Sequence, residues 1–148
     1  MIKLTTPLTQ IDSSPLYTLG SRTTDKSGNE YIYLKGVAST VAGSAVTYDG
    51  SYATALAVAN AKGCVAIAMA AIVANKYGWY QIKGVATGIS AATVISGAPL
   101  YLTATAGELD DAVVAGDLVA GAFAYGKGGT HASCTFYLNY PFCTDTLS

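Results

Sequence analysis

The sequence predicts an all-β protein, folded as a single compact β-barrel or sandwich with an extended N-terminal arm. Residues 30–38 and 77–86 alternate in character with a period of two, which is typical of a strand that has one face in a core. Turn signals such as Asp49-Gly50 separate further β-rich stretches. At 148 residues the chain has the length of one domain with a core of its own.

Residues 1–28 are expected to form the arm and a polar loop, ahead of a β domain over residues 29–148. The arm is rich in Ser and Thr, and Pro7 and Pro15 restrict the residues before them to extended geometry. Leu16 and Tyr17 mark its anchor. Apolar residues recur at Leu4, Leu8, Ile11, Leu16 and Leu19. This recurrence favours an arm that packs on a surface over a disordered terminus.

Strands are expected at 30–38, 45–48, 63–72, 77–86, 116–124 and 133–140, with a further apolar segment at 98–103. The stretch 63–72 is apolar on both faces and therefore predicts a strand buried on both. Pro141 is expected to end the last strand. Residues 52–61 are alanine-rich and leave two interpretations open, a short helix behind Ser51 or a strand and loop.

An internal repeat would build the domain from two similar β units. Lys35-Gly36-Val37-Ala38-Ser39 matches Lys83-Gly84-Val85-Ala86-Thr87, and residues 63–68 roughly match residues 116–121. The alternative is chance similarity in a chain rich in Ala, Gly and Val.

The sequence contains no recognisable catalytic, metal-binding or cofactor-binding motif, so we expect neither an enzyme nor a cofactor. His131 is the only histidine, and no Gly-x-Ser-x-Gly elbow accompanies it. The only acidic cluster is Glu108, Asp110, Asp111 and Asp117. It lacks the alternation and the glycine of an EF-hand loop. Residues 126–130 do not have the order of a phosphate-binding loop.

The charge content points away from nucleic acid and toward protein partners. Only 11% of the residues are charged, 51% are apolar, and the net charge is -1. A surface so poor in charge suggests that other chains cover part of it. Without a basic run, phosphate binding has little electrostatic support. No apolar run is long enough to span a bilayer and no signal peptide is visible, so we expect a soluble protein made in a cytoplasm.

The three cysteines, Cys64, Cys134 and Cys143, have no metal-binding spacing. We expect them to be reduced and structural, with a Cys134–Cys143 disulfide as the alternative.

Aromatic side chains provide the strongest functional signal. If the even-numbered side chains, such as Tyr80, Ile82 and Ala86, form the core, then Tyr31, Tyr33, Trp79 and Tyr137 point outward. Exposed aromatic residues in a weakly charged protein indicate an interaction surface. Two alternatives stay open: a second layer such as the arm covers them, or they stack on a sugar.

Several motifs resemble those of the small capsid decoration (cement) proteins of tailed bacteriophages. They are Leu19-Gly20-Ser21-Arg22, residues 28–33, Tyr77-Gly78-Trp79 and residues 99–111, within a likeness that runs over about residues 16–125. The resemblance implies a β-rich protein outside an icosahedral shell, commonly a trimer, that binds the major capsid protein. The expected location is then the exterior of the virion, after synthesis in the host cytoplasm.

We therefore take as candidate interface residues Leu16, Tyr17, Arg22, Tyr31, Tyr33, Trp79 and Tyr137. The alternative function is a β-sandwich module that binds carbohydrate or a host surface through Trp79 and nearby tyrosines.

Overall fold

The computed structural model describes residues 3–146, and this part of the chain contains ten strands and no helix. The predicted all-β class is confirmed. The strands are β1 (Arg22–Thr24), β2 (Glu30–Lys35), β3 (Ala45–Tyr48), β4 (Thr54–Leu56), β5 (Gly63–Ala68), β6 (Tyr77–Ser90), β7 (Pro99–Leu102), β8 (Leu109–Asp110), β9 (Leu118–Ala124) and β10 (Ala132–Cys143). The predicted arm and β domain extend to residues 1–2 and 147–148, which lie outside the described residues.

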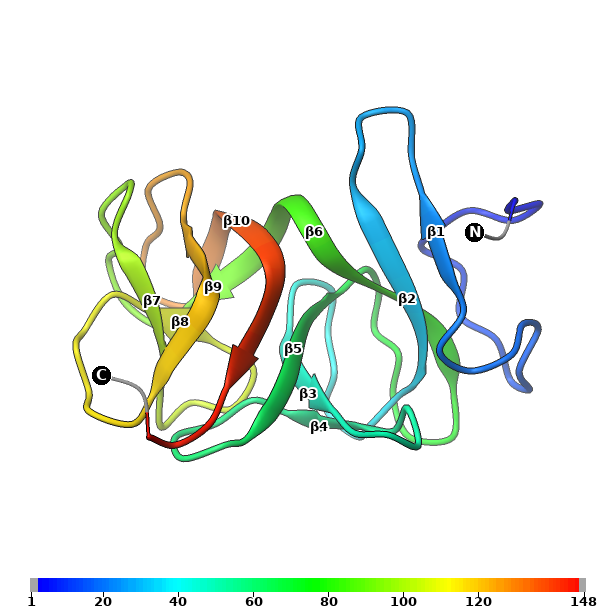
Figure 1. Ribbon diagram of the computed structural model, residues 1–148, viewed down its shortest axis with the longest axis horizontal. Helices are drawn as coiled ribbons and strands as arrows, with labels where there is room; N and C mark the ends of the chain where they lie inside the picture. The colour runs from blue at the N-terminus through cyan, green and yellow to red at the C-terminus, as the bar shows by residue number, and fades with distance from the viewer. Residues whose placement is uncertain (1–2, 147–148) are drawn as a thin grey trace.

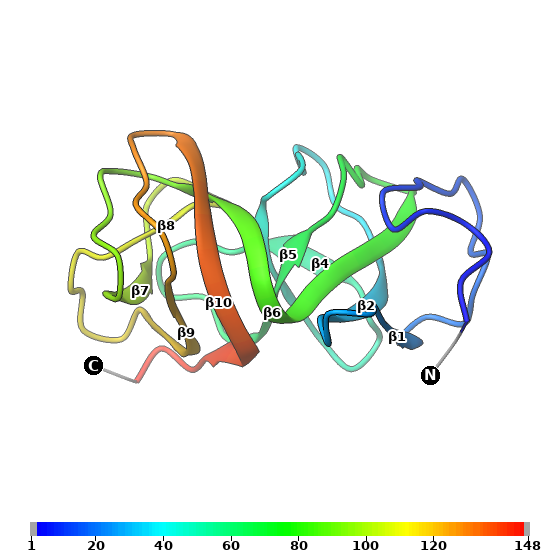
Figure 2. The same ribbon diagram turned by 90° about the horizontal axis from the view of Figure 1, so that it is seen from above.

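The ten strands form one mixed sheet in the order β1-β2-β6-β8-β7-β9-β10-β5-β3-β4, with additional β6–β10 and β6–β5 pairings. Because β6 also pairs with β10, the strands β6, β8, β7, β9 and β10 close into a ring, as in a small barrel. The long strand β6 spans 14 residues. It connects a lobe that holds β1 to β5 with a lobe that holds β7 to β10 (Figures 1 and 2).

Two apolar cores lie on the two sides of β5. Val65 and Ile67 of β5 face the core inside the ring, together with residues such as Phe136. Ala66 and Ala68 face a second core, which contains Ile32, Leu34, Tyr80 and Ile82. The sequence prediction of a strand buried on both faces is therefore correct for residues 65–68 only, because Cys64 is exposed and the strand predicted to reach Ile72 ends at Ala68.

A bend at Gly84 lets β6 serve both lobes. Residues before it pair with β2, and residues 83–90 pair with β10. Gly84 has φ of 96°, a left-handed conformation that favours glycine, and a Cβ there would lie 1.9 Å from Asn29 Oδ1. The buried Gln81 amide stabilises the bend by donating to the carbonyl oxygens of Lys83 (3.0 Å) and Val85 (3.1 Å).

Two local expectations are resolved by the strand boundaries. Residues 52–61 contain the short strand β4 and loops, so the strand-and-loop interpretation holds and the helix does not. The expectation that Pro141 ends the last strand is wrong. Strand β10 continues to Cys143. The register against β9 shifts between Leu138 and Phe142, and Pro141 lies inside this irregularity, where its missing N–H costs no hydrogen bond between the strands.

The three cysteines are free thiols, so the alternative Cys134–Cys143 disulfide is absent. Cys134 and Cys143 are buried, whereas Cys64 is exposed. Burial raises the pKa of the Cys143 thiol to about 11, which keeps it protonated and unreactive near neutral pH.

The two members of the strongest repeat occupy different structural positions. Lys35 is the last residue of β2, and the chain then leaves the sheet, with φ of 68° at Ser39. Lys83 and Thr87 both lie inside β6. The weaker pair is closer to equivalence, since Gly63 begins β5 and Gly116 lies in the turn that leads into β9.

No helix among the described residues is long and apolar enough to cross a membrane.

Candidate interaction surface

The arm covers the aromatic cluster that the sequence analysis expected on the surface. Tyr31, Tyr33 and Trp79 are only 4%, 0% and 1% exposed, and arm residues including Leu4, Leu8, Tyr17 and Leu19 pack against them. The ring centroid of Tyr17 lies 5.3 Å from that of Tyr33 and 5.4 Å from that of Trp79. The expectation that these three residues point into solvent is therefore wrong, and the alternative, cover by the arm, is what the structure contains.

Hydrogen bonds hold the arm on this cluster. The Tyr33 hydroxyl donates to Asp12 Oδ2 and accepts from the Leu16 N–H at 3.1 Å. Asp12 and Tyr77 exchange two backbone hydrogen bonds, of 2.9 and 3.0 Å. Burial and the bond to Asp12 raise the pKa of Tyr33, so the phenol stays neutral. The arm is therefore bound to its own chain by apolar packing and by specific polar contacts.

The other predicted interface residues fall into two places. Leu16 is 52% exposed on the arm, while Tyr17, the next arm residue, is half-buried against the aromatic cluster. Arg22 is exposed and lies 3.4 Å from the buried carboxylate of Glu30. Its guanidinium also lies 5.9 Å from the ring centre of Tyr140. Arg22 thus contacts Glu30 and Tyr140 and is not a member of the cluster of Tyr31, Tyr33 and Trp79.

Tyr137 lies on an open sheet face of the barrel. It is opposite Val85 of β6 and Phe123 of β9, and Phe123 is opposite Pro99 of β7. Opposite residues of antiparallel strands share a face, so Val85, Tyr137, Phe123 and Pro99 form a line across four strands. With Tyr125, we call this set the apolar row.

The apolar row is exposed and uncharged. Val85, Phe123 and Tyr125 are 41%, 40% and 56% exposed. The Tyr137 ring stacks on Phe123 with centroids 5.2 Å apart, and Tyr125 lies 6.4 Å from Tyr137. The sequence analysis identified Tyr137 alone. The signal that could have found the others is the alternation Phe123-Ala124-Tyr125 at the end of an apolar strand.

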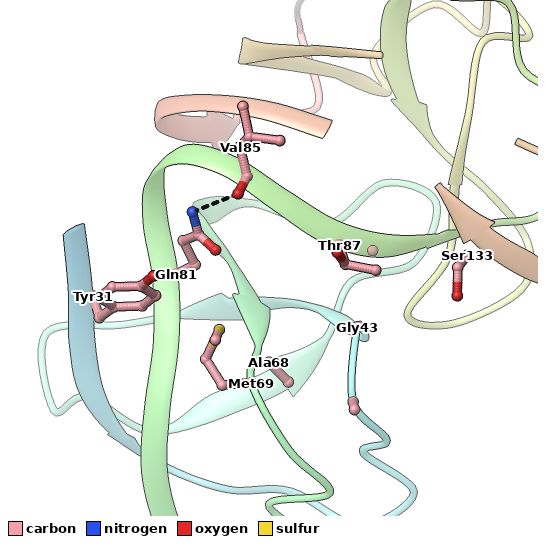
Figure 3. Close-up of a pocket in the computed structure, with 10 residues that line it drawn as sticks. Tyr31, Gly43, Ala68, Met69, Gln81, Val85, Thr87 and Ser133 are labelled. Carbon is pink, nitrogen blue, oxygen red and sulfur yellow. Dashed lines mark hydrogen bonds between the residues drawn. The ribbon is translucent and has the colours of Figure 1, made fainter. Parts of the chain in front are cut away.

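A groove adjoins the apolar row on the concave side of the β6 bend (Figure 3). It has a volume of about 390 Å³, and its lining includes Tyr31, Ala42, Met69, Gln81, Thr87 and Ser133. Val85 belongs to both features, since its side chain joins the row while its carbonyl oxygen points to Gln81 in the groove (Figure 3). None of the lining residues is charged.

The acidic cluster serves the loops around it. Asp117 Oδ1 accepts the Asn60 N–H at 2.7 Å, and Asp111 Oδ2 accepts the Ile95 N–H at 2.9 Å. Glu108 Oε2 lies 2.6 Å from His131 Nδ1. Among residues 3–146, no group of His, Cys, Asp and Glu side chains is arranged to hold a metal ion. We therefore take the apolar row and the groove as the candidate interaction surface.

A scan against protein-family models and searches of curated proteins and solved structures found no match to this chain.

Proposed function

We propose that this protein decorates and stabilises the head of a tailed bacteriophage from outside, by binding the major capsid protein and its own copies. The observation that carries the proposal is the apolar row, an exposed and uncharged face of the barrel. Exposed apolar faces of this kind are typical of protein–protein contacts. The sequence motifs that resemble decoration proteins specify the partner, and on that resemblance we favour a trimer.

Self-association is the part of the proposal that the apolar row supports most directly. Copies can approach through this face without like-charge repulsion, because none of its members carries a charge. Tyrosine and phenylalanine are enriched at such contacts, and desolvated tyrosine rings are among the residues that commonly dominate their free energy. The arm adds extended chain at one end of the molecule, where Leu16 is exposed for a further contact (Figure 2).

The carbohydrate-binding alternative has lost its main support. It required Trp79 to stack on a sugar, but this side chain is 1% exposed and covered by the arm. The Phe123 and Tyr137 rings are stacked on each other, which leaves less ring face for a ligand. We therefore do not propose a second function.

The first experiment is to look for the protein in purified phage particles, by mass spectrometry and by mapping the density outside the capsid shell. We expect it on the exterior of mature heads, and its absence from them would refute the proposal.

A second experiment tests the apolar row in solution. The double variant Phe123→Ser, Tyr125→Ser should shift the oligomer toward monomer in analytical ultracentrifugation, with a fall in association constant of at least 10-fold. Val113→Ser is the matched control, because Val113 is 76% exposed and lies outside the row. Equal association constants for wild type, the double variant and Val113→Ser would show that the apolar row is not part of the interface.

A further inference from the structure

Beyond the bend, β6 has one edge without a strand partner. One edge of residues 83–90 pairs with β10. On the other edge, pairing with β2 extends only to Lys83, and pairing with β8 involves only Ser90. Among the described residues, no strand pairs with this edge between those two positions. Unpaired strand edges are templates for another chain.

The backbone groups of this edge point into the groove. The Thr135 carbonyl oxygen accepts the N–H groups of Tyr125 (2.8 Å) and Gly126 (3.2 Å), so Thr135 directs its backbone groups to β9. Thr87, the residue opposite Thr135, is therefore in a non-hydrogen-bonded pair and directs its N–H and C=O away from β10. The Val85 carbonyl points the same way, since it accepts the Gln81 amide at 3.1 Å.

The residues that surround this edge of β6 in the groove are uncharged. Its lining is apolar or polar without charge, and Thr87 and Ala42 are exposed at its opening. A charged segment would lose water there and find no counter-charge, which is unfavourable. The backbone of Gly43 packs against the Thr87 carbonyl oxygen, which a Cβ on Gly43 would approach to 3.3 Å. An uncharged extended segment could instead accept a hydrogen bond from the Thr87 N–H, with its side chains between Tyr31, Met69 and Ser133.

We propose that this groove binds an extended, uncharged segment of a partner protein, which lies along residues 85–87 of β6 and accepts a hydrogen bond from the Thr87 N–H. The inference rests on the proposed function, under which the segment belongs to the major capsid protein. A second copy is a poorer source. Its arm is held on its own chain through Asp12 and Tyr77, and its other described segments are built into the barrel and its loops.

The test compares two arginine variants of the full chain on empty capsid shells that lack the protein. Ala42→Arg places a long charged side chain in the groove. Ala104→Arg makes the same change at an exposed position that does not line it. In cosedimentation we expect wild type and Ala104→Arg to bind equally and Ala42→Arg to bind at least 10-fold more weakly. Thermal unfolding of each variant checks that the fold is retained.

The outcomes separate the groove from the function. If wild type binds and Ala42→Arg binds equally well, the groove inference is overturned while decoration stands. If wild type does not bind the shells, the proposed function fails and the inference falls with it. Amide hydrogen exchange gives a direct readout. The Thr87 N–H should become protected at least 10-fold on the shells, and an unchanged exchange rate for the bound protein would also overturn the inference.

Discussion

Replacement of Gly84 by alanine should destabilise the protein strongly, because this residue sets the bend of β6. At φ of 96° a side chain is strained, which costs about 1–2 kcal/mol. The new Cβ would lie 1.9 Å from Asn29 Oδ1, so Asn29 must move. Asn29 is held by Asp25, whose carboxylate accepts its Nδ2 at 2.8 Å and its backbone N–H at 3.0 Å.

The size of the effect follows from those contacts. Loss of one hydrogen bond to a charged group costs about 1.5–3 kcal/mol. Together with the strain, Gly84→Ala should lower the free energy of unfolding by about 2.5–5 kcal/mol. At roughly 4 °C per kcal/mol for a chain of this length, the melting temperature should fall by about 10–20 °C. Urea denaturation with a common m-value provides the free energies.

Gly28→Ala is the matched control. Gly28 has φ of 84°, but no other group lies within 4 Å of the place that its Cβ would take, so only the strain of about 1–2 kcal/mol applies. In addition, Gly84→Ala should cost less in an Asn29→Ala background, by at least about 1 kcal/mol, because the two sites are in contact. A Gly84→Ala cost equal to that of Gly28→Ala would refute the role assigned to Asn29.

Three further effects are expected. Deletion of residues 1–18 should lower the melting temperature and shift the emission of the single tryptophan to the red, because the arm buries it; unchanged emission would contradict the packing. Tyr33→Phe should cost about 1.5–3 kcal/mol in urea through loss of the bond to the Asp12 carboxylate, whereas the exposed Tyr125→Phe should cost less than about 0.5 kcal/mol. Burial raises the pKa of Tyr80 to about 12 from 10.0. Folding therefore favours the neutral phenol, so the stability that is fully present below pH 10 should be lost as the pH rises toward 12. Circular dichroism follows unfolding and phenolate absorbance follows ionisation; unfolding at a lower pH, before any phenol ionises, would contradict this.

The strand pattern and part of the core could be predicted from the sequence, because they depend on local alternation. Tyr80, Ile82 and Ala86 are buried as expected, and β3 begins and ends where predicted. The bend at Gly84 could not be predicted, since a glycine in a strand pattern is equally consistent with a flat strand. Its left-handed conformation follows from the approach of Asn29, which is a tertiary contact.

The surface was harder to predict, because alternation separates two faces but does not say what covers each. The arm covers the face of β6 that carries Trp79. In the sequence, this cover was indicated by the regularly spaced leucines of the arm. The apolar row depends on the register of four strands that are distant along the chain. Tyr137 could be identified from its own strand, whereas its contact with Phe123 required the fold.

The bend in β6 also explains why the candidate surface lies at one end of this strand and not the other. Before Gly84, the outer face of β6 carries Trp79, and the arm buries it. After Gly84, the outer face carries Val85, which is 41% exposed beside the rings of the apolar row. The same turn removes β2 from the edge of β6 and opens the groove. An exposed apolar face and an unpaired strand edge therefore arise together, and both favour a partner that is a protein chain.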